Sequence, residues 1–397
     1  MGEIRKCKYE ELDDVIELSS FAFQYEANPD IIANIRSRLK PEHIWGYFDE
    51  DKLVSMASLL PLEVMIHNQV FSMGGVAGVA SWPEHRRKGI VKQLLKKALS
   101  EMKEKEMTVS MLAPFSFAFY RKYGWETLSE YKKYTISKSH FPKIKSEIGT
   151  FIRYRKIQDC WQLLNEIYEQ YTAKYNGLLK RDENWWFQRV FQEQYNIQVY
   201  YNELGSPEGY LLFKVKDRQM NVKEMVFLNE KARTQLWRLI IQHDSMIEKV
   251  QLTAPVDDPL SFVLSDPTFE QEMNSYFMMR IVDVEQFIRE YPFYASGVKQ
   301  QFMITVKDEF AEWNDGLFDI QIDENGKARV HKVSFCAQHE MVDTSIHCSI
   351  QSLSSLLSGF QSVETLYQLG KMDGPEEQIH HFGFLIPKKT TYFMDFF

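Results

Sequence analysis

Residues 70–99 read VFSMGGVAGVASWPEHRRKGIVKQLLKKAL and predict a strand, a short basic loop and a helix. Small and β-branched residues fill positions 76–80, as a buried strand needs. Pro83 ends this strand, because proline has no N–H to donate to a ladder. The apolar side chains that follow recur at helical spacing, which predicts an amphipathic helix over residues 87–104.

The loop between the strand and the helix has the features of an anion site. The first turn of a helix carries N–H groups without internal partners and a partial positive charge. Gly89 lets a ligand approach the backbone closely, while Arg86, Arg87 and Lys88 add formal charge. The stretch therefore predicts a seat for a pyrophosphate. The alternative is a solvated basic helix start, which the strand before it and the helix after it make less favoured.

Residues 76–92 resemble motif A of the GCN5-related N-acetyltransferases (GNAT), a family that binds acetyl-coenzyme A (acetyl-CoA). The family signature is Arg or Gln, two residues, Gly, one residue, then Gly or Ala, and residues 86–90 fit it. Val91 departs from the signature, because it is larger than the usual last residue. This departure, together with the Pro-x-His-Arg-Arg lead-in at 83–87, is similar to the Eis-type (enhanced intracellular survival) branch.

The resemblance implies how acetyl-CoA is held. Two parallel strands, 76–80 and 107–113, must splay apart so that the pantetheine arm can lie between them, and a right-handed strand–helix–strand crossover builds such a pair. The residues implied to bind the coenzyme are Val79, Ala80, Ser81, Arg86, Arg87, Lys88, Gly89, Ile90, Val91, Lys92, Phe115 and Ser116.

Tyr120 is the candidate general acid. The Tyr-Gly-Trp string at 123–125 resembles the aromatic–Gly–aromatic string of the superfamily, and Tyr120 sits where Eis-type enzymes keep the acid. A phenol with a pKa near 10 can protonate the thiolate that leaves when an amine attacks the thioester. The alternative is a tyrosine packed under the sheet, a part that Tyr123 or Tyr131 could also play.

The chain ends in an unusually apolar tail, Tyr392-Phe-Met-Asp-Phe-Phe397. Free tails are usually polar, whereas burial of two phenylalanine rings is favourable and draws the terminal carboxylate into the protein. In Eis-type enzymes this carboxylate enters the first active site as the base, and Phe397 is the matching position. An α-carboxyl group is a weak base unless desolvation raises its pKa, so it could also act through a water or hold the ammonium. A tail docked only for stability or oligomer contacts is the alternative.

The composition is that of an ordinary globular protein of 397 residues, enough for two or three domains. A net charge of −8 argues against nucleic-acid binding and suits a cationic substrate. Cysteines and histidines, Cys336 and His339 among them, show no metal-ligand or redox spacing, so no metal is expected. The N-terminus lacks a signal core, and no apolar run reaches the ~20 residues that span a bilayer. We expect a cytoplasmic protein with no membrane partner.

We expect an α+β protein of three units, at residues 1–149, 150–280 and 281–397. The second unit repeats the element order of the first without an Arg-x-x-Gly loop, so it resembles a degenerate GNAT fold that has lost its coenzyme site. The third is similar to the sterol-carrier-like domain of Eis-type proteins, which does not imply lipid binding. The resemblance also implies a hexamer.

The acceptor site is the least defined part of the prediction. Aromatic residues with a neighbouring carboxylate would suit an amine, although core packing is the alternative. The candidates are Phe21, Phe23, Tyr25, Glu26 and Trp45.

The sequence therefore predicts an acetyl-CoA-dependent N-acetyltransferase that acts by direct attack. Its acceptor would be the primary amine of a cationic small molecule, with aminoglycosides suggested by the resemblance, or a lysine side chain. One alternative is an acyltransferase with another acyl donor, since N-myristoyl transferases also use a C-terminal carboxylate. The other is a non-enzymatic lipid-binding or partner-binding protein that acts through the third unit.

Overall fold

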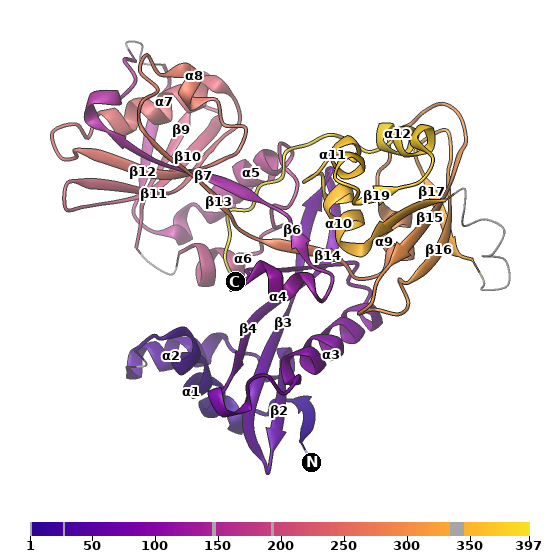
Figure 1. Cartoon of the computed structure of the whole chain (residues 1–397). Helices are drawn as coiled ribbons and strands as arrows, with labels where there is room; N and C mark the ends of the chain where they lie inside the picture. Colours follow the sequence, from indigo (N-terminus) through magenta and orange to yellow (C-terminus); the bar gives the residue numbers. More distant parts are fainter. Residues whose placement is uncertain (1, 27, 145–147, 192–193, 334–344) are drawn as a thin grey trace.

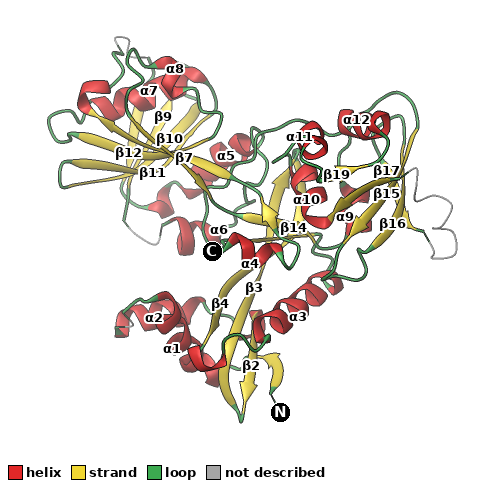
Figure 2. Cartoon of the chain, viewed as in Figure 1, coloured by secondary structure: helices red, strands yellow, loops and turns green. Residues whose placement is uncertain are grey.

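The computed structural model describes residues 2–397 except 27, 145–147, 192–193 and 334–344, so Cys336 and His339 lie outside the described residues. Three lobes meet around the C-terminus, which lies at the centre of the molecule (Figure 1). Each lobe has one sheet with helices packed on it (Figure 2). No helix among the described residues is long and apolar enough to cross a membrane.

The first lobe holds a sheet in the order β1-β2-β3-β4-β5-β14-β6. Strands β3 and β4 form its long central hairpin, and α3 crosses over from β4 to the parallel strand β5. The bounds are β1 (Glu3–Lys6), α1 (Leu12–Phe23), α2 (Pro29–Arg38), β2 (Ile44–Asp49), β3 (Lys52–Ile66), β4 (Gln69–Ser81), α3 (Ile90–Glu104), β5 (Val109–Leu112), α4 (Phe117–Arg121) and β6 (Glu126–Thr127).

The second lobe holds a sheet in the order β13-β7-β12-β11-β10-β9-β8. Its bounds are β7 (Glu130–Ser137), β8 (Thr150–Tyr154), α5 (Trp161–Thr172), α6 (Glu183–Trp185), β9 (Asn196–Tyr201), β10 (Pro207–Lys216), β11 (Gln219–Phe227), α7 (Glu230–Ile241), β12 (Lys249–Pro255), α8 (Leu260–Val263) and β13 (Glu270–Ser275). A turn of π-helix, Trp186–Val190, follows α6. Because β7 already belongs to this sheet, the sheets divide near residue 129 and not at the expected 149/150 boundary.

Strand β14 (Met278–Ile281) returns from the second lobe into the first sheet, where it pairs antiparallel with both β5 and β6. Its Arg280 side chain is fully buried and forms an ion pair with Asp308 of the third lobe. This strand therefore fastens the lobes together, and the sequence pattern did not predict it.

The third lobe holds a sheet in the order β17-β16-β15-β18-β19. Strand β15 pairs antiparallel with β16 and parallel with β18. The bounds are α9 (Val284–Glu290), β15 (Gln300–Lys307), β16 (Gly316–Ile322), β17 (Ala328–Lys332), β18 (Ile346–Ser349), α10 (Ile350–Ser358), α11 (Val363–Gln368), β19 (Met372–Asp373) and α12 (Glu376–Phe384).

Asn176 joins all three lobes through hydrogen bonds. Its side-chain oxygen accepts from the N–H of His67 at the β3–β4 turn, at 2.7 Å, and its side-chain nitrogen donates to the carbonyl of Ser358 at the end of α10. Its backbone bridges the C-terminal tail on both sides, with Thr390 and Tyr392 as partners. The tail is therefore fixed at the junction of the lobes before it reaches the first sheet.

His67 makes this junction sensitive to acid. Burial lowers its pKa from 6.5 to about 4, and the nearby Lys389 charge acts in the same direction. The unfolded chain takes up this proton below about pH 6.5 and the folded chain does not, so stability falls as the pH drops from about 6.5 towards 4. We expect His67 to contribute a loss of at most about 1.4 kcal/mol per pH unit within that window.

Urea denaturation at pH 7 and pH 5 checks this expectation. His67→Asn tolerates the positive φ of 49° at this position and removes the proton uptake, so its pH dependence should be shallower. His381→Asn on an exposed histidine is the control and should keep the wild-type slope. Equal slopes in wild type and His67→Asn would contradict the assignment.

Candidate active site

Strands β4 and β5 separate at the carboxyl end of β5. They pair only over Met73–Val76 and Val109–Leu112, and β4 then runs on to Ser81 without this neighbour. On its other edge β4 carries a bulge between Ala77 and Ala80, where Gly78 has a φ of +56°. A bulge turns backbone groups out of the ladder. Backbone groups near Gly78 and Val79 can therefore bind an extended ligand in the gap.

The basic loop lies at the start of α3, with Arg86, Arg87, Lys88 and Gly89 all exposed. The helix begins at Ile90 and not at the expected residue 87, because Arg87 and Gly89 both adopt positive φ angles, 63° and 76°. No side chain caps the first turn of α3, and a Cβ on Gly89 would meet no atom within 4 Å. The first-turn N–H groups thus face open space beside three cations, an arrangement that can hold a phosphate.

A cavity of about 720 Å³ opens where β4, α4 and the C-terminal tail meet. It brings together residues from both ends of the chain and from the second lobe. The predicted site residues that line it are Phe23, Tyr25, Val79, Phe115, Tyr120 and Phe397.

Tyr120 lies on the short helix α4, whose first turn is capped by the Ser116 side chain. Its ring packs among Phe115, Phe119 and Trp125, and only 3% of the residue is exposed. This burial raises the pKa of the Tyr120 hydroxyl above its ordinary value. The phenol therefore keeps its proton at neutral pH and can act as an acid.

The tail carries Phe397 onto the first sheet. The Phe397 ring contacts the rings of Phe277 and Trp185, with centroids at 5.0 and 6.3 Å. A Cβ on Gly75 of β4 would come within 2.9 Å of this ring. Glycine at position 75 thus makes the room in which the last residue docks beside Tyr120.

Asp395 anchors the tail two residues before its end. Its carboxylate accepts hydrogen bonds from the guanidinium of Arg181 and from the indole N–H of Trp185, at 3.1 and 2.8 Å. Arg181 also forms a two-pronged ion pair with Glu224 of β11, and the side chains of all three charged residues are almost fully buried. The Asp395 carbonyl accepts from the hydroxyl of Tyr276. These contacts fix the direction in which the terminal carboxylate leaves the tail.

Family comparisons agree with the three lobes. Acetyltransferase (GNAT) domain models match residues 3–128 and 177–281, and a sterol carrier protein domain model matches residues 284–394. An uncharacterized N-acetyltransferase of Streptomyces griseus is 23% identical over 354 residues, which span 83% of this chain and 82% of the relative. The N-acetyltransferase Eis of Mycobacterium bovis is 22% identical over 54% of this chain and 56% of its own length.

A solved structure from Enterococcus faecalis V583, described as a probable N-acyltransferase, superimposes with a TM-score of 0.92 at 26% identity and covers all of both chains. The chain belongs to the Eis-type GNAT acetyltransferases. The α+β fold of two tandem GNAT domains and a sterol-carrier-like domain is confirmed, and the protein is an acyltransferase.

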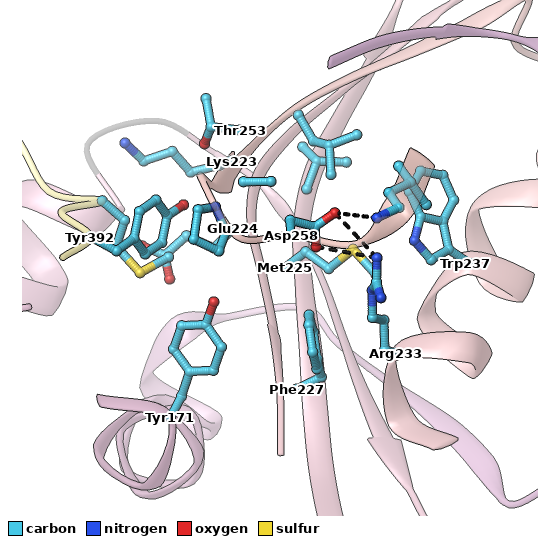
Figure 3. Close-up of a pocket in the computed structure, with 16 residues that line it drawn as sticks. Tyr171, Lys223, Glu224, Met225, Phe227, Arg233, Trp237, Thr253, Asp258 and Tyr392 are labelled. Atoms are coloured by element: carbon cyan, nitrogen blue, oxygen red, sulfur yellow. Dashed lines mark hydrogen bonds and ion pairs between the residues drawn. The ribbon is translucent and has the colours of Figure 1, made fainter. Parts of the chain in front are cut away.

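In this Eis-type enzyme the second GNAT domain uses its strand gap to hold the tail. Strands β11 and β12 pair in parallel over 219–221 and 249–251 and then separate, as β4 and β5 do. Tyr392 and Met394 of the tail line this gap, and the space left is about 20 Å³. Figure 3 shows Tyr392 on one side of it and the Arg233–Asp258 ion pair on the other.

The anion seat of the second domain is also closed. The side chain of Asn229 caps the first turn of α7, where the first domain has the bare Gly89. Arg233, one turn further on, is paired with Asp258 and Glu230. A gap of about one water's volume cannot admit a pantetheine arm.

The remaining predicted residues of this Eis-type enzyme lie outside the cavity. Ala80 and Ser81 are buried against β3, where the Ser55 hydroxyl contacts both. Phe21 is half-exposed against Trp82, and Glu26 is exposed. Trp45 is not brought to the site, because its indole N–H donates to Glu101 of α3 on the other side of the lobe.

Three cavity-lining cations were missed by sequence reasoning: Arg38 of α2, Arg189 of the π-helical turn and Lys223 of β11. The last turn of a helix commonly carries basic residues, so nothing local distinguishes Arg38. The Asp395 anchor was missed as well, although a carboxylate among aromatic tail residues is a signal for a buried ion pair.

Proposed function

We propose that this protein is an acetyl-CoA-dependent N-acetyltransferase that transfers the acetyl group directly to a primary amine. The observation that carries the proposal is the single cavity shared by Tyr120, the open edge of β4 at Val79 and the last residue, Phe397. Sequence alone predicts a cationic small molecule, aminoglycoside-like, or a lysine side chain as acceptor.

The first domain has features that suit both ends of acetyl-CoA, the pyrophosphate end and the thioester end. The exposed Arg86–Gly89 loop and the uncapped first turn of α3 suit the pyrophosphate. The gap beyond Val76 and Leu112 suits the pantetheine arm, and it leads into the cavity that Tyr120 lines. Through this arm acetyl-CoA supplies a thioester, which is an acyl donor with a good leaving group.

Two residues of the cavity then carry out the two proton transfers of the reaction. As the amine nitrogen attacks the acetyl carbonyl carbon, the terminal carboxylate of Phe397 takes the proton that the nitrogen loses. When the carbon–sulfur bond breaks, Tyr120 gives its hydroxyl proton to the departing sulfur. Proton exchange with water restores the carboxylate and the phenol, and the new bond is an amide.

Replacing Tyr120 by Phe is expected to lower kcat on the order of 10²-fold, because the ring still packs but the acid is lost. Release of free thiol from acetyl-CoA over an amine panel measures the rate. Tyr123→Phe is the matched control, since its ring packs beside Phe119 and Phe310 and does not line the cavity. A wild-type rate in Tyr120→Phe would remove the assignment.

Isothermal titration with acetyl-CoA tests the proposal as a whole. We expect saturable binding that weakens when Arg87 and Lys88 are both replaced by Gln, since both side chains are exposed beside the helix start. Absence of binding at millimolar acetyl-CoA would overturn the proposal. A preference for long acyl chains in a donor panel would replace acetyl transfer by another acyl transfer. The hexamer stays a prediction, which sedimentation velocity checks.

A further inference from the structure

The charges that line the cavity differ in sign from the net charge of the chain. Its cations, Arg38, Arg189 and Lys223, come from three separate elements in two lobes. Its carboxylates are Asp395, which Arg181 and Trp185 already engage, and the terminal group of Phe397, to which we assign the base. Glu26, the carboxylate expected here, does not line the cavity. The surface that an acceptor meets is therefore mainly basic.

Arg38 and Arg189 lie close together, and neither is paired with a carboxylate of the described residues. Arg38 donates to the carbonyls of Asn34 and Gln188, and the second of these contacts spans the first and second lobes. Among the described residues, none of the carboxylates forms an ion pair with Arg38, Arg189 or Lys223. Burial lowers the pKa of Arg189, and the neighbouring charge of Arg38 lowers it further. Two partly buried like charges raise the energy of the empty site, and an anion placed between them relieves it.

These cations do not belong to the pyrophosphate seat. The cavity is lined by Val76–Val79 and Phe115, whereas the Arg86–Gly89 loop, at the far end of the β4 gap, is not part of its lining. Tyr25 lines the cavity, and its hydroxyl oxygen is buried without a hydrogen-bond partner among the described residues, so it is not itself open to the cavity. Two neighbouring guanidinium groups are by themselves a donor set for an oxyanion.

Resting on the proposed function, we infer that the acceptor is a primary amine that also carries an oxyanion, a carboxylate or a phosphate. Arg38 and Arg189 bind the oxyanion, and the amine points towards Tyr120 and Phe397. Phe23, Phe115 and Phe396 provide apolar walls for the carbon chain between the two groups. A polycation such as an aminoglycoside meets like charge at this site and is a poor acceptor.

A matched series of acceptors tests the inference by thiol release. We use 5-aminopentanoate, 5-aminopentyl phosphate, 5-aminopentanol and 1,5-diaminopentane, with kanamycin as the polycation. We expect kcat/KM for the better of the two anionic amines to exceed that for the diamine by 10-fold to 100-fold. The carboxylate and phosphate members distinguish the two oxyanions. Equal or higher kcat/KM for the diamine or kanamycin overturns the inference.

Substitutions show whether the two arginines carry the preference. In Arg38→Gln and Arg189→Gln the ratio of kcat/KM for the anionic amine to that for 5-aminopentanol should fall by 10-fold or more. Arg155→Gln, on an exposed side chain of the second lobe, should keep the wild-type ratio. Circular dichroism and the Kd for acetyl-CoA verify that each variant is folded. If a Gln variant does not fold, the corresponding Arg→Lys variant, which retains the charge, replaces it in the test. An unchanged ratio in folded variants overturns the inference.

Binding separates the failure of this inference from that of the proposed function. Titration of 5-aminopentanoate and 5-aminopentyl phosphate into the protein with coenzyme A present needs no turnover. If acetyl-CoA binds but neither anionic amine does, the inference fails and the acetyltransferase stands. If acetyl-CoA itself does not bind, the proposed function fails and the inference fails with it.

Discussion

Adding a single glycine after Phe397 is expected to lower kcat by about 10²-fold to 10⁴-fold, the range that a positioned proton acceptor contributes. The added residue leaves the Phe397 ring against Gly75, Phe277 and Trp185 but moves the terminal carboxylate outward by one residue, about 3.5 Å of extended chain. The Kd for acetyl-CoA should stay near the wild-type value, because the Arg86–Gly89 loop is untouched.

Extending the chain tests the terminal carboxylate separately from the Phe397 ring. Deleting Phe397 would remove the ring and move the carboxylate at the same time. Deletion also removes a side chain that is only 7% exposed, and loss of a buried phenylalanine costs about 3–5 kcal/mol. A glycine inserted after Gly205 is the matched control, since this exposed turn of the second lobe has no atom near its Cβ position. If the chain extended at its C-terminus retains full activity, the terminal carboxylate is not the base.

The local parts of the site were predictable, because neighbouring residues specify them. The strand, the basic turn and the amphipathic helix of 70–99 each follow from a few consecutive side chains, and the structure has them as β4, the Arg86–Gly89 loop and α3. The error at the start of the helix is also local. Basic residues are compatible with a helix, so the sequence places the start of the helix at residue 87. The positive φ of Arg87 shows that the turn continues past this residue.

Contacts between distant segments were not predictable from the pattern. Strand β14 is four residues long, and its place between β5 and β6 depends on where the second lobe returns the chain. Arg38 and Arg189 meet only because α2 and the π-helical turn of another lobe pack together. Net charge has the same limit, since it averages over the whole surface and does not report the charges that line one cavity.

Replacing Arg181 by Met is expected to lower the free energy of unfolding by about 3–5 kcal/mol, because two buried carboxylates lose their shared cation. The side chains of Arg181 and Glu224 have no exposed surface, and that of Asp395 is 4% exposed. Repulsion between Glu224 and Asp395 should then release the tail. We therefore expect kcat to fall as well, although residue 181 does not line the cavity.

Urea denaturation followed by tryptophan fluorescence measures the loss, since the Trp186 ring lies against Arg181 and Trp185 donates a hydrogen bond to Asp395. Arg218→Met breaks an ion pair with Glu248 whose side chains are 63% and 55% exposed, and exposed pairs contribute about 0–1 kcal/mol. Arg181→Lys keeps the charge but not the planar fork that serves both carboxylates, so its stability should lie between those of wild type and Arg181→Met. If Arg181→Met proved as stable and as active as Arg218→Met, the second domain would not be the anchor of the C-terminal tail. The second GNAT domain, whose strand gap is filled by the tail, would then have some other role beside the cavity of the first domain.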